Sequence, residues 1–305
     1  MNILITGGAG LLGSTLIRTA PKNHHIYATF HENTLLPKTS STEFIYVDIR
    51  NKDEVEAAIQ KIKPNLIIHT AAKGSPDFCE FNKEEAWTVN VIGSQNILEA
   101  AKKVQAKTLF TSSNQVFSGN NPPYAEDSPV SPVNHYGKTK VQTEVDIIEN
   151  NYDAIILRLM TMYGWSNPNG QKNVVPWLIE ALSEKKPLKM VDDIFNNFLY
   201  VYQAAESIWE LIENAKNLTR INIAGSDTEN RYNFALLVAE LFDFDSSLLT
   251  PVHKNYFKDE APRPLNTIYD ISLFKKKFKT AAYTLREGVT HMKKNKQVIS
   301  WEQHN

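Results

Sequence analysis

Short, almost continuously apolar segments alternate with helical segments over the first 160 residues of the chain. The intervening helices are expected at 11–20, 51–62, 84–104 and 135–150, where apolar residues such as Val55, Ile59 and Ile62 recur at helical spacing. Strands that alternate with helices pair in parallel through right-handed crossovers, and strands this apolar are buried on both faces. The sequence therefore predicts an α/β fold with a doubly wound parallel sheet. Its six expected strands are 2–6, 25–30, 43–47, 65–71, 107–113 and 154–159.

The alternation loosens after residue 160. Segment 164–170 (GWSNPNG) is rich in turn formers. Segment 220–224 (RINIA) is a further strand, which we expect to return to the main sheet. We therefore expect one domain from 1–160 plus 198–225, and a smaller, discontinuous C-terminal domain from 161–197 plus 226–305. The remaining expected elements are helices at 174–183, 204–212, 233–242 and 285–294 and extended segments at 188–191 and 198–201.

The composition excludes several classes of protein. The 305 residues include 33 basic and 34 acidic side chains, so the basic footprint of a nucleic-acid-binding protein is missing. The sequence has no run of 18 apolar residues that would span a membrane, and no apolar signal segment opens it. The single cysteine, Cys79, rules out an internal disulfide framework and a multi-cysteine zinc site, and the histidines show no metal-ligand spacing. We therefore expect a cytoplasmic protein without a metal.

A glycine-rich loop joins the first expected strand to the first expected helix. Glycine permits a sharp turn and the close approach of a pyrophosphate, and the free N–H groups at the start of a helix attract that anion. In this strand–loop–helix context the pattern predicts a dinucleotide-binding (Rossmann) fold. The residues expected at the cofactor are Gly7, Gly10, Leu11, Leu12 and Gly13.

The end of the second strand does not decide between NAD(H) and NADP(H). An acidic residue that holds the ribose is usual at this place, but the strand ends in Phe30 and is followed by His31 and Glu32. Glu32 is suited to a ribose hydroxyl, whereas His31 and Lys38 favour a 2′-phosphate.

The end of the third strand offers a candidate for the adenine edge. Asp48 and Ile49 follow this strand directly. Asp48 is equally a candidate N-cap of the expected helix at 51–62, because aspartate is a preferred capping residue.

Tyr136 and Lys140 lie four residues apart in an expected helix, which places them on one helix face. A free tyrosine has a pKa near ~10 and is a poor acid or base at neutral pH, but a neighbouring ammonium lowers that pKa. The phenol is then suited to move a proton as hydride moves, and Lys140 is suited to hold the nicotinamide ribose. Ser113 ends the fifth strand and is placed to hydrogen-bond the same substrate oxygen. These three residues are the expected catalytic group of an oxidoreductase.

Together these motifs resemble the extended short-chain dehydrogenase/reductase family and, within it, the dTDP-4-dehydrorhamnose reductases and their relatives. The resemblance runs nearly from end to end of the chain. It implies that Ala71, Ala72 and Asn90 border the cofactor and that the C-terminal domain binds the substrate. Besides the glycine loop, it is carried by IHTAA at 68–72, WTVN at 87–90, SSNQVFSG at 112–119, NPPYAE at 121–126 and RPLN at 263–266.

The family implies NAD(P)H-dependent reduction of a 4-keto sugar carried on a nucleotide, as in dTDP-rhamnose biosynthesis. In that mechanism hydride goes to C4, Tyr136 protonates the new alkoxide, Lys140 tunes Tyr136 and binds ribose, and Ser113 polarises the carbonyl. Arg263 is implied as a contact of the nucleotide phosphate. The resemblance also implies a homodimer in which helices 84–104 and 135–150 pair across a two-fold axis.

Three positions near the expected substrate depart from the family's pattern. Asn114-Gln115 stand where Asp-Tyr is usual, Thr161 where a tryptophan is frequent, and Phe198-Leu199 where Pro-Thr is expected. Asn114, Thr161 and Arg263 are therefore the candidate substrate-binding residues, and the identity of the sugar stays open.

Two alternatives remain open. One is an epimerase or dehydratase of the same superfamily, although Asn114-Gln115 count against a dehydratase, which needs acidic residues there. The other is a non-catalytic, nucleotide-binding regulatory subunit, because a regulatory subunit of a eukaryotic methionine adenosyltransferase resembles this family. The presence of Ser113, Tyr136 and Lys140 counts against that alternative.

Overall fold

Seven parallel strands form the central sheet of the computed structural model, which describes residues 1–32, 35–170, 172–214, 218–258, 261–295 and 301–303. The strand order is β12-β7-β6-β5-β1-β2-β4, and every neighbouring pair runs parallel. The chain starts in the middle of the sheet and builds outward in both directions, which confirms the predicted doubly wound fold. The strands are β1 (Asn2–Thr6), β2 (His25–Phe30), β4 (Thr42–Tyr46), β5 (Leu66–His69), β6 (Lys107–Ser113), β7 (Ala154–Leu159) and β12 (Arg220–Ile223).

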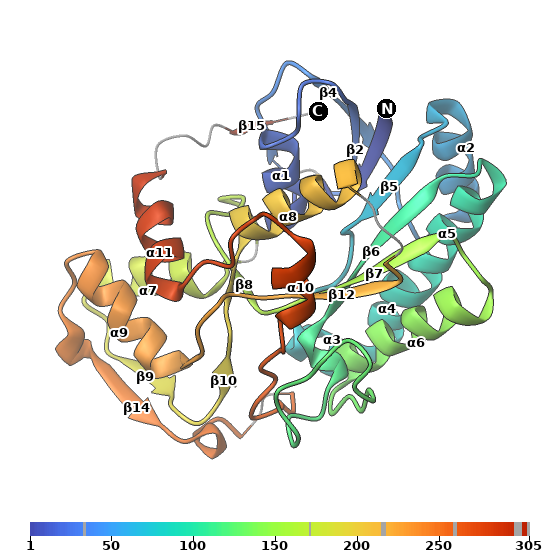
Figure 1. The fold of residues 1–305 in the computed structure, drawn as a ribbon. Coiled ribbons are helices and arrows are strands. Elements are labelled where there is room, and N and C mark those ends of the chain that lie inside the picture. Colours follow the sequence, from blue (N-terminus) through green and yellow to red (C-terminus); the bar gives the residue numbers. More distant parts are fainter. Residues whose placement is uncertain (33–34, 171, 215–217, 259–260, 296–300, 304–305) are drawn as a thin grey trace.

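Helices cover both faces of this sheet (Figure 1). Successive residues of a strand point to opposite faces, so Ile3 and Ile5 join one buried cluster and Leu4 joins the other. The cluster around Ile3 is closed by α1 (Leu11–Arg18), α8 (Val201–Asn214) and α10 (Ser272–Lys277). The opposite face is covered by α2 (Lys52–Ile62), α5 (Gly93–Lys103) and α6 (His135–Glu149).

Apart from α8, α10, β12 and β15 (Trp301–Gln303), the elements that follow β7 form a smaller group beside the sheet (Figure 1). Their core is a parallel pair of strands, β9 and β14, on which helix α9 packs. Two further short pairs, β8 with β11 and β10 with β13, lie between this group and the sheet. The domain boundaries given above stay a prediction. The bounds are α7 (Val174–Ser183), α9 (Arg231–Leu241), α11 (Leu285–Lys294), β8 (Met162–Tyr163), β9 (Leu188–Val191), β10 (Phe195–Asn196), β11 (Leu199–Tyr200), β13 (Glu229–Asn230) and β14 (Leu249–Val252).

The helix expected at 84–104 is interrupted. α4 (Lys83–Trp87) passes through one π-helical turn, η1 (Thr88–Ile92), before α5 begins. Turns of this kind are rare and are frequent at functional sites. Asn90 lies in η1, so the irregular turn contains one of the predicted cofactor residues.

Several elements were not expected from the sequence, among them a helix after β5 and a strand after β2. Helix α3 (Pro76–Phe81) follows β5 and is capped by the Ser75 hydroxyl, which accepts from the Phe78 N–H. Strand β3 (Leu35–Pro37) follows β2 and pairs antiparallel with β15 (Trp301–Gln303), so residues 301–303 lie beside the segment that follows β2.

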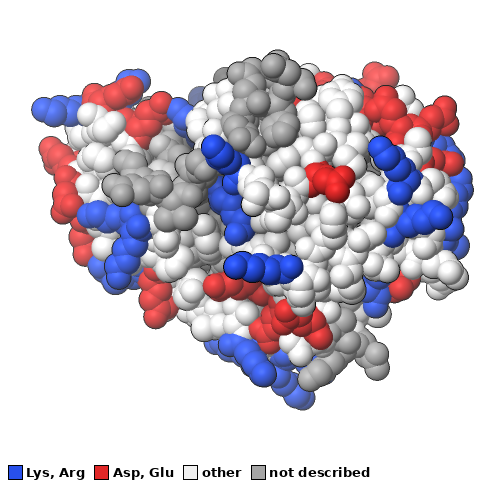
Figure 2. Space-filling model, turned by 90° about the horizontal axis from the view of Figure 1, so that it is seen from above, with Lys and Arg blue, Asp and Glu red and all other residues white. Residues whose placement is uncertain are grey.

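Charge on the surface is mixed. On the face shown in Figure 2, lysine and arginine side chains are interspersed with acidic ones around a largely uncharged middle. Among the residues described, no helix has both the length and the apolar character to cross a bilayer. The same residues contain no group of three His, Cys, Asp or Glu side chains arranged to hold a metal ion.

Candidate active site

The glycine loop is too tightly packed to accept larger residues. Gly7 has a φ of +73°, and a Cβ atom at Gly13 would lie 2.2 Å from the Gly7 carbonyl oxygen. Helix α1 begins at Leu11 behind Gly10, which has no side chain to accept from the N–H groups of the first turn. This end of the helix therefore offers its N–H groups and its dipole to an anion. The loop fits a pyrophosphate, as predicted.

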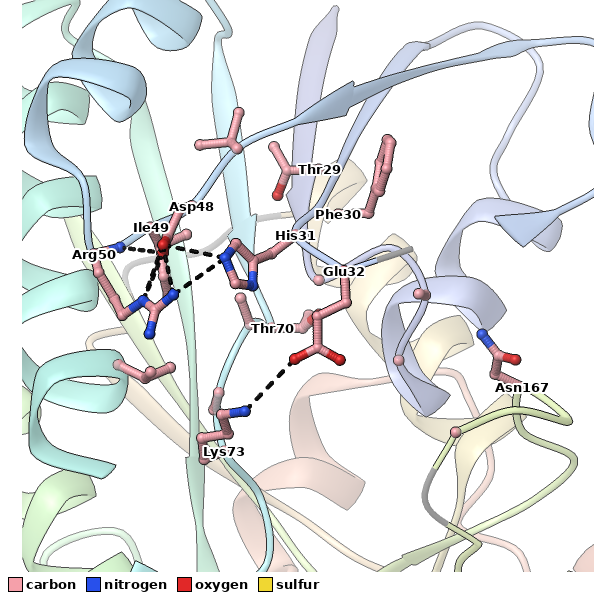
Figure 3. Close-up of a pocket in the computed structure, with 18 of the residues that line it drawn as sticks. Thr29, Phe30, His31, Glu32, Asp48, Ile49, Arg50, Thr70, Lys73 and Asn167 are labelled. Atoms are coloured by element: carbon pink, nitrogen blue, oxygen red, sulfur yellow. Dashed lines mark hydrogen bonds and ion pairs between the residues drawn. The ribbon is translucent and has the colours of Figure 1, made fainter. Parts of the chain in front are cut away.

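Two adjoining cavities open beside this loop, and both are lined by Ala9, Gly10, Thr70 and Ala72. The first, here called the β2 cavity, has a volume of about 510 Å³ and lies at the ends of β2, β4 and β5 (Figure 3). The second, here called the β6 cavity, has a volume of about 520 Å³ and extends to the end of β6 and the start of α6. Together they have the shape of an elongated site that starts at the glycine loop and runs in two directions.

All predicted cofactor residues except Asn90 line one of these cavities. The β2 cavity includes Gly7, Gly10, Asp48, Ile49, Ala71 and Ala72. The β6 cavity includes Gly10, Leu11, Leu12, Gly13, Ala72, Tyr136 and Lys140.

Asn90 is buried behind the cavities and holds their wall together. Its Oδ1 accepts from the Lys73 N–H at 2.8 Å, and its Nδ2 donates to the Lys73 carbonyl at 3.1 Å and to Thr139 Oγ1 at 3.2 Å. Asn90 thus ties the loop after β5 to helix α6. The sequence pattern predicted that Asn90 borders the cofactor. In the structure its side chain contacts other residues of the protein and does not line either cavity.

In the β2 cavity, each basic group has an acidic partner (Figure 3). Arg50 donates to both carboxylate oxygens of Asp48, from Nε at 2.9 and 3.0 Å and from Nη2 at 2.7 Å. His31 Nε2 lies 3.1 Å from the same carboxylate. Lys73 Nζ lies 3.7 Å from Glu32, the residue considered for the ribose, and 3.4 Å from Glu85. Hydrogen bonding to Arg50 holds the pKa of Asp48 below its usual value.

The competing interpretation of Asp48 as a helix cap is wrong. Asn51 caps α2, because its side chain accepts from the N–H groups of Asp53 and Glu54. The Asp48 side chain instead lines the β2 cavity and pairs with Arg50. Sequence reasoning missed Arg50, because it looked for a basic residue after β2 and Arg50 follows β4.

A buried histidine supports the floor between the two cavities. His69 Nδ1 lies 2.7 Å from Thr6 Oγ1, and His69 Nε2 lies 2.9 Å from Ser94 Oγ. The Ser94 hydroxyl donates to the Asn90 carbonyl at 2.6 Å. Its oxygen therefore accepts a hydrogen bond from His69, and the hydrogen of the neutral ring lies on Nε2. Burial lowers the pKa of His69 to about 3, so the ring is neutral. It is a structural link between β1, β5 and α5.

Ser113, Tyr136 and Lys140 converge in the β6 cavity. Gly137 makes this possible, because a Cβ atom there would lie 2.1 Å from the Gln115 carbonyl, so α6 can begin directly against the loop after β6. Asn134 caps the helix by accepting from the Gly137 N–H at 2.9 Å. The Ser113 hydroxyl acts on the Tyr136 phenol and lowers its pKa.

The electrostatics of this group differ from the expectation. Burial raises the pKa of Tyr136 to about 12, and the Ser113 hydroxyl offsets only part of that shift. Lys140 Nζ lies 5.8 Å from the centre of the Tyr136 ring and donates to the Thr111 carbonyl at 2.9 Å. Burial also lowers the pKa of Lys140 to about 8. Desolvation therefore outweighs the predicted effect of the lysine on the phenol.

The three candidate substrate residues all line the β6 cavity. Asn114 is 3% exposed, and its Nδ2 donates to Thr267 Oγ1 at 2.7 Å and to Asn196 Oδ1 at 3.3 Å. Its Oδ1 accepts from the Ser113 hydroxyl at 3.3 Å. The side chain that departs from the family's pattern therefore connects Ser113 to the C-terminal part of the chain. Thr161 follows β7, and Arg263 is paired with Asp77.

Cationic side chains line the β6 cavity, and those of Lys172 and Arg263 have their acidic partners, Glu180 and Asp77, outside the lining. Lys172 and Arg231 line it together with Lys140 and Arg263, and its described lining residues include no aspartate or glutamate. Sequence analysis did not single out Lys172, Arg231 or Asp77, because they come from distant segments and belong to no recognised motif.

Comparison with known proteins places this geometry in context. The family model described as RmlD substrate binding domain matches residues 1–298. Over 283 residues the chain is 31% identical to methionine adenosyltransferase 2 subunit beta of Xenopus tropicalis, with 90% of this chain and 81% of that protein covered. Spore coat polysaccharide biosynthesis protein SpsK of Bacillus subtilis is 25% identical over 267 residues, with 87% of this chain and 88% of that protein covered.

Solved structures share the fold over almost the whole chain. A dTDP-4-dehydrorhamnose reductase from Bacillus anthracis, in complex with NADP, matches with a TM-score of 0.86 and 25% identity, covering 96% of this chain and 99% of that one. A UDP-glucose 4-epimerase from Thermotoga maritima, with UDP-glucose, matches with a TM-score of 0.84 and covers 98% and 99%. At 22% identity, the second match shows a common fold alone.

Proposed function

This chain belongs to the family of the RmlD substrate binding domain, and from that membership we propose that it is an NAD(P)H-dependent reductase of a 4-keto deoxysugar carried on a nucleotide. The observation that carries the proposal is the convergence of Ser113, Tyr136 and Lys140 in a cavity that adjoins the glycine loop. A phenol, an alcohol and an ammonium at one point are what protonation of a nascent alkoxide requires.

The glycine loop and the β2 cavity are the parts that fit the dinucleotide. Gly7 and Gly13 leave no room for a side chain where the pyrophosphate approaches, and the start of α1 supplies N–H donors. The adenine fits beside Asp48 and Ile49. When bound, the nicotinamide supplies hydride for the keto carbon of the substrate.

The protein's own residues handle the proton. With a pKa of about 12 the Tyr136 phenol is protonated at neutral pH, so it can donate its proton to the oxygen that becomes negative during reduction. Ser113 lines the same cavity, and its hydroxyl, which donates to Asn114 Oδ1 at 3.3 Å, can donate to the same substrate oxygen instead. Lys140 carries a positive charge below its pKa of about 8, which stabilises the phenolate left behind.

The substrate end supports an anionic ligand. Four cationic side chains and no carboxylate are found among the described residues that line the β6 cavity. A nucleotide-linked sugar carries a diphosphate, which such a cavity attracts. Asn114, Thr161 and Arg263 are the proposed substrate contacts.

The proposal is tested by mixing the full chain with NADPH or NADH and a 4-keto deoxysugar nucleotide. The expected result is stoichiometric loss of absorbance from the reduced cofactor and formation of the hydroxylated sugar nucleotide. Inversion of a hydroxyl-bearing carbon in a sugar nucleotide that has no keto group, with no net cofactor consumption, would instead identify an epimerase.

A regulatory subunit is the second candidate, and one observation favours it. The relative at 31% identity is the beta subunit of methionine adenosyltransferase 2. This candidate predicts no turnover with any keto sugar nucleotide, and tight co-purification with a methionine adenosyltransferase catalytic subunit. The catalytic group in the β6 cavity supports the reductase over this alternative.

The proposal includes a homodimer formed through α4–η1 and α6. Large apolar side chains are exposed on these elements, with Trp87 37%, Ile92 39% and Ile148 52% exposed. Exposed apolar side chains gathered on neighbouring helices are typical of an interface. Light scattering of the wild-type chain and of an Ile148→Lys variant tests this pairing.

A further inference from the structure

One ion pair crosses the rim of the β6 cavity. Asp77 lies in the first turn of α3, the short helix that follows β5. Arg263 lies 186 residues further along the chain. Arg263 Nη2 donates to Asp77 Oδ2 at 2.7 Å, and the Ala261 N–H donates to Asp77 Oδ1 at 2.8 Å. One carboxylate therefore holds both a guanidinium and a backbone amide of the 261–263 segment.

The two partners differ in their surroundings. The Arg263 side chain is only 13% exposed and lines the cavity, whereas the Asp77 side chain is 41% exposed and stands at the rim. Burial alone would raise the pKa of Asp77, but the bonds from Arg263 and Ala261 and the charge of Arg231 hold it below its usual value. Two arginines thus act on a single, partly hydrated carboxylate.

The contacts that Asp77 receives are those that a phosphoryl group prefers. A guanidinium N–H and a backbone N–H that point at one pair of oxygens also recognise phosphate oxygens. A partly exposed ion pair contributes little net stability, so a ligand with more negative charge can exchange with it.

We propose that Asp77 is a specificity-determining residue whose carboxylate occupies the phosphate-binding position on Arg263. Only a ligand with a strongly anionic diphosphate then displaces this carboxylate and binds Arg263. This inference rests on the proposed function and assigns a role to a residue outside the catalytic group. Neutral sugars, and sugars with a single negative charge, compete poorly with the carboxylate and are excluded.

The test is the affinity of the full-length chain for dTDP, UDP and thymidine, measured by isothermal titration calorimetry. Asp77→Asn is the informative variant, because an asparagine Oδ1 still accepts from the Ala261 N–H while its negative charge is gone. We expect this variant to bind dTDP and UDP about 3- to 10-fold more tightly than wild type, and the gain to shrink as salt is raised. Binding of uncharged thymidine should not change.

Two further variants make the result specific. Arg263→Gln should weaken dTDP binding, and Asp77→Asn added to Arg263→Gln should bring no gain, because the carboxylate acts through this arginine. Glu240→Gln is the matched control, since Glu240 pairs with Arg286 in an exposed ion pair outside the cavity lining. It should leave dTDP binding unchanged.

Three outcomes would overturn the inference. They are unchanged or weaker binding of dTDP by a folded Asp77→Asn variant, a gain that persists without Arg263, and the absence of nucleotide binding by every variant. Cofactor oxidation with a keto sugar nucleotide is a separate measurement. A wild-type enzyme that turns over while Asp77→Asn binds dTDP as wild type does would remove the role of Asp77 and leave the reductase intact.

Discussion

The β2 cavity and the β6 cavity are nearly equal in volume, about 510 and 520 Å³, but they differ in how charge is arranged. In the β2 cavity Arg50 is paired with Asp48, and Lys73 with Glu32 and Glu85. In the β6 cavity four cations line the wall, and the described lining residues contain no acid.

This difference separates two ways of holding an anion. At the glycine loop, between the cavities, backbone N–H groups and a helix dipole bind without a side-chain charge. At the β6 end, four cationic side chains are suited to attract an anion over a longer range, and two of them, Arg263 and Lys172, are paired with Asp77 and Glu180 outside the cavity lining. Affinity for the dinucleotide should therefore depend mainly on backbone fit, whereas affinity for the substrate should depend on charge and ionic strength.

The largest effect should come from removing the proton donor of the β6 cavity. Tyr136→Phe takes away the phenolic hydroxyl, and turnover should fall about 10²- to 10⁴-fold, the usual contribution of a general acid. Affinity for the dinucleotide should change little, because the loop and the β2 cavity are untouched. Steady-state kinetics and a cofactor titration measure the two quantities. Tyr152→Phe, at a tyrosine that contacts Lys102, is the control and should retain full turnover.

The backbone basis of cofactor binding is tested at the glycine loop. Gly13→Ala places a Cβ atom 2.2 Å from the Gly7 carbonyl and so displaces the loop. Loss of about 2 kcal/mol of hydrogen bonding to the pyrophosphate corresponds to about 30-fold weaker binding of NADH and NADPH alike. In Gly74→Ala the new methyl group meets nothing within 4 Å, so its affinity should stay at the wild-type value. Equal affinities for the two variants would show that the loop does not bind the cofactor.

The charge of the β6 cavity should also appear in the pH dependence. Lys140 has a pKa lowered to about 8, so it loses its positive charge as the pH rises through that value. Reduction should therefore slow above pH 8 by about tenfold per pH unit, because a neutral lysine no longer stabilises the phenolate. The pH profile of kcat/KM measures this limb. A rate that rises steadily from pH 7 to pH 10 would contradict the assigned role.

The smallest expected effect concerns the balanced pairs of the β2 cavity. Arg50→Met leaves Asp48 unpaired with arginine and makes the cavity more negative. Binding of NADPH, which has an added 2′-phosphate, should then weaken about 5-fold more than binding of NADH, or about 1 kcal/mol. Fluorescence titration with both cofactors gives the ratio, with Arg286→Met as the remote control. An equal loss for both cofactors would show that Arg50 does not distinguish them.

Much of the fold could be predicted from the sequence, because the local pattern determines it. The helices 174–183 and 285–294 and the strands 107–113 and 154–159 have the predicted bounds, since apolar periodicity and capping residues decide them locally. The glycine loop and the tyrosine–lysine pair were found for the same reason, because each is a short motif.

The features that were missed depend on contacts between distant segments. The sequence shows nothing that pairs Asp77 with Arg263, because 186 residues separate them and neither lies in a motif that names its partner. Asn90, in the π-helical turn, is hydrogen-bonded to Lys73 and Thr139, which lie 17 residues before it and 49 residues after it. The raised pKa of Tyr136 results from burial in the folded site. The spacing of Tyr136 and Lys140 along the sequence does not predict how deeply the phenol is buried.

The strand pair β3–β15 joins residues 301–303 to the segment that follows β2. β15 lies along β3, β3 follows the turn after β2 that contains His31 and Glu32, and the Leu35 carbonyl accepts from Asn167 at 2.7 Å. A purification tag or fluorophore fused to the C-terminus would therefore follow β15, which pairs with β3 close to the β2 cavity residues His31 and Glu32. Such a label would report on occupancy of that cavity, and an N-terminal tag is the safer choice for measuring native cofactor affinity.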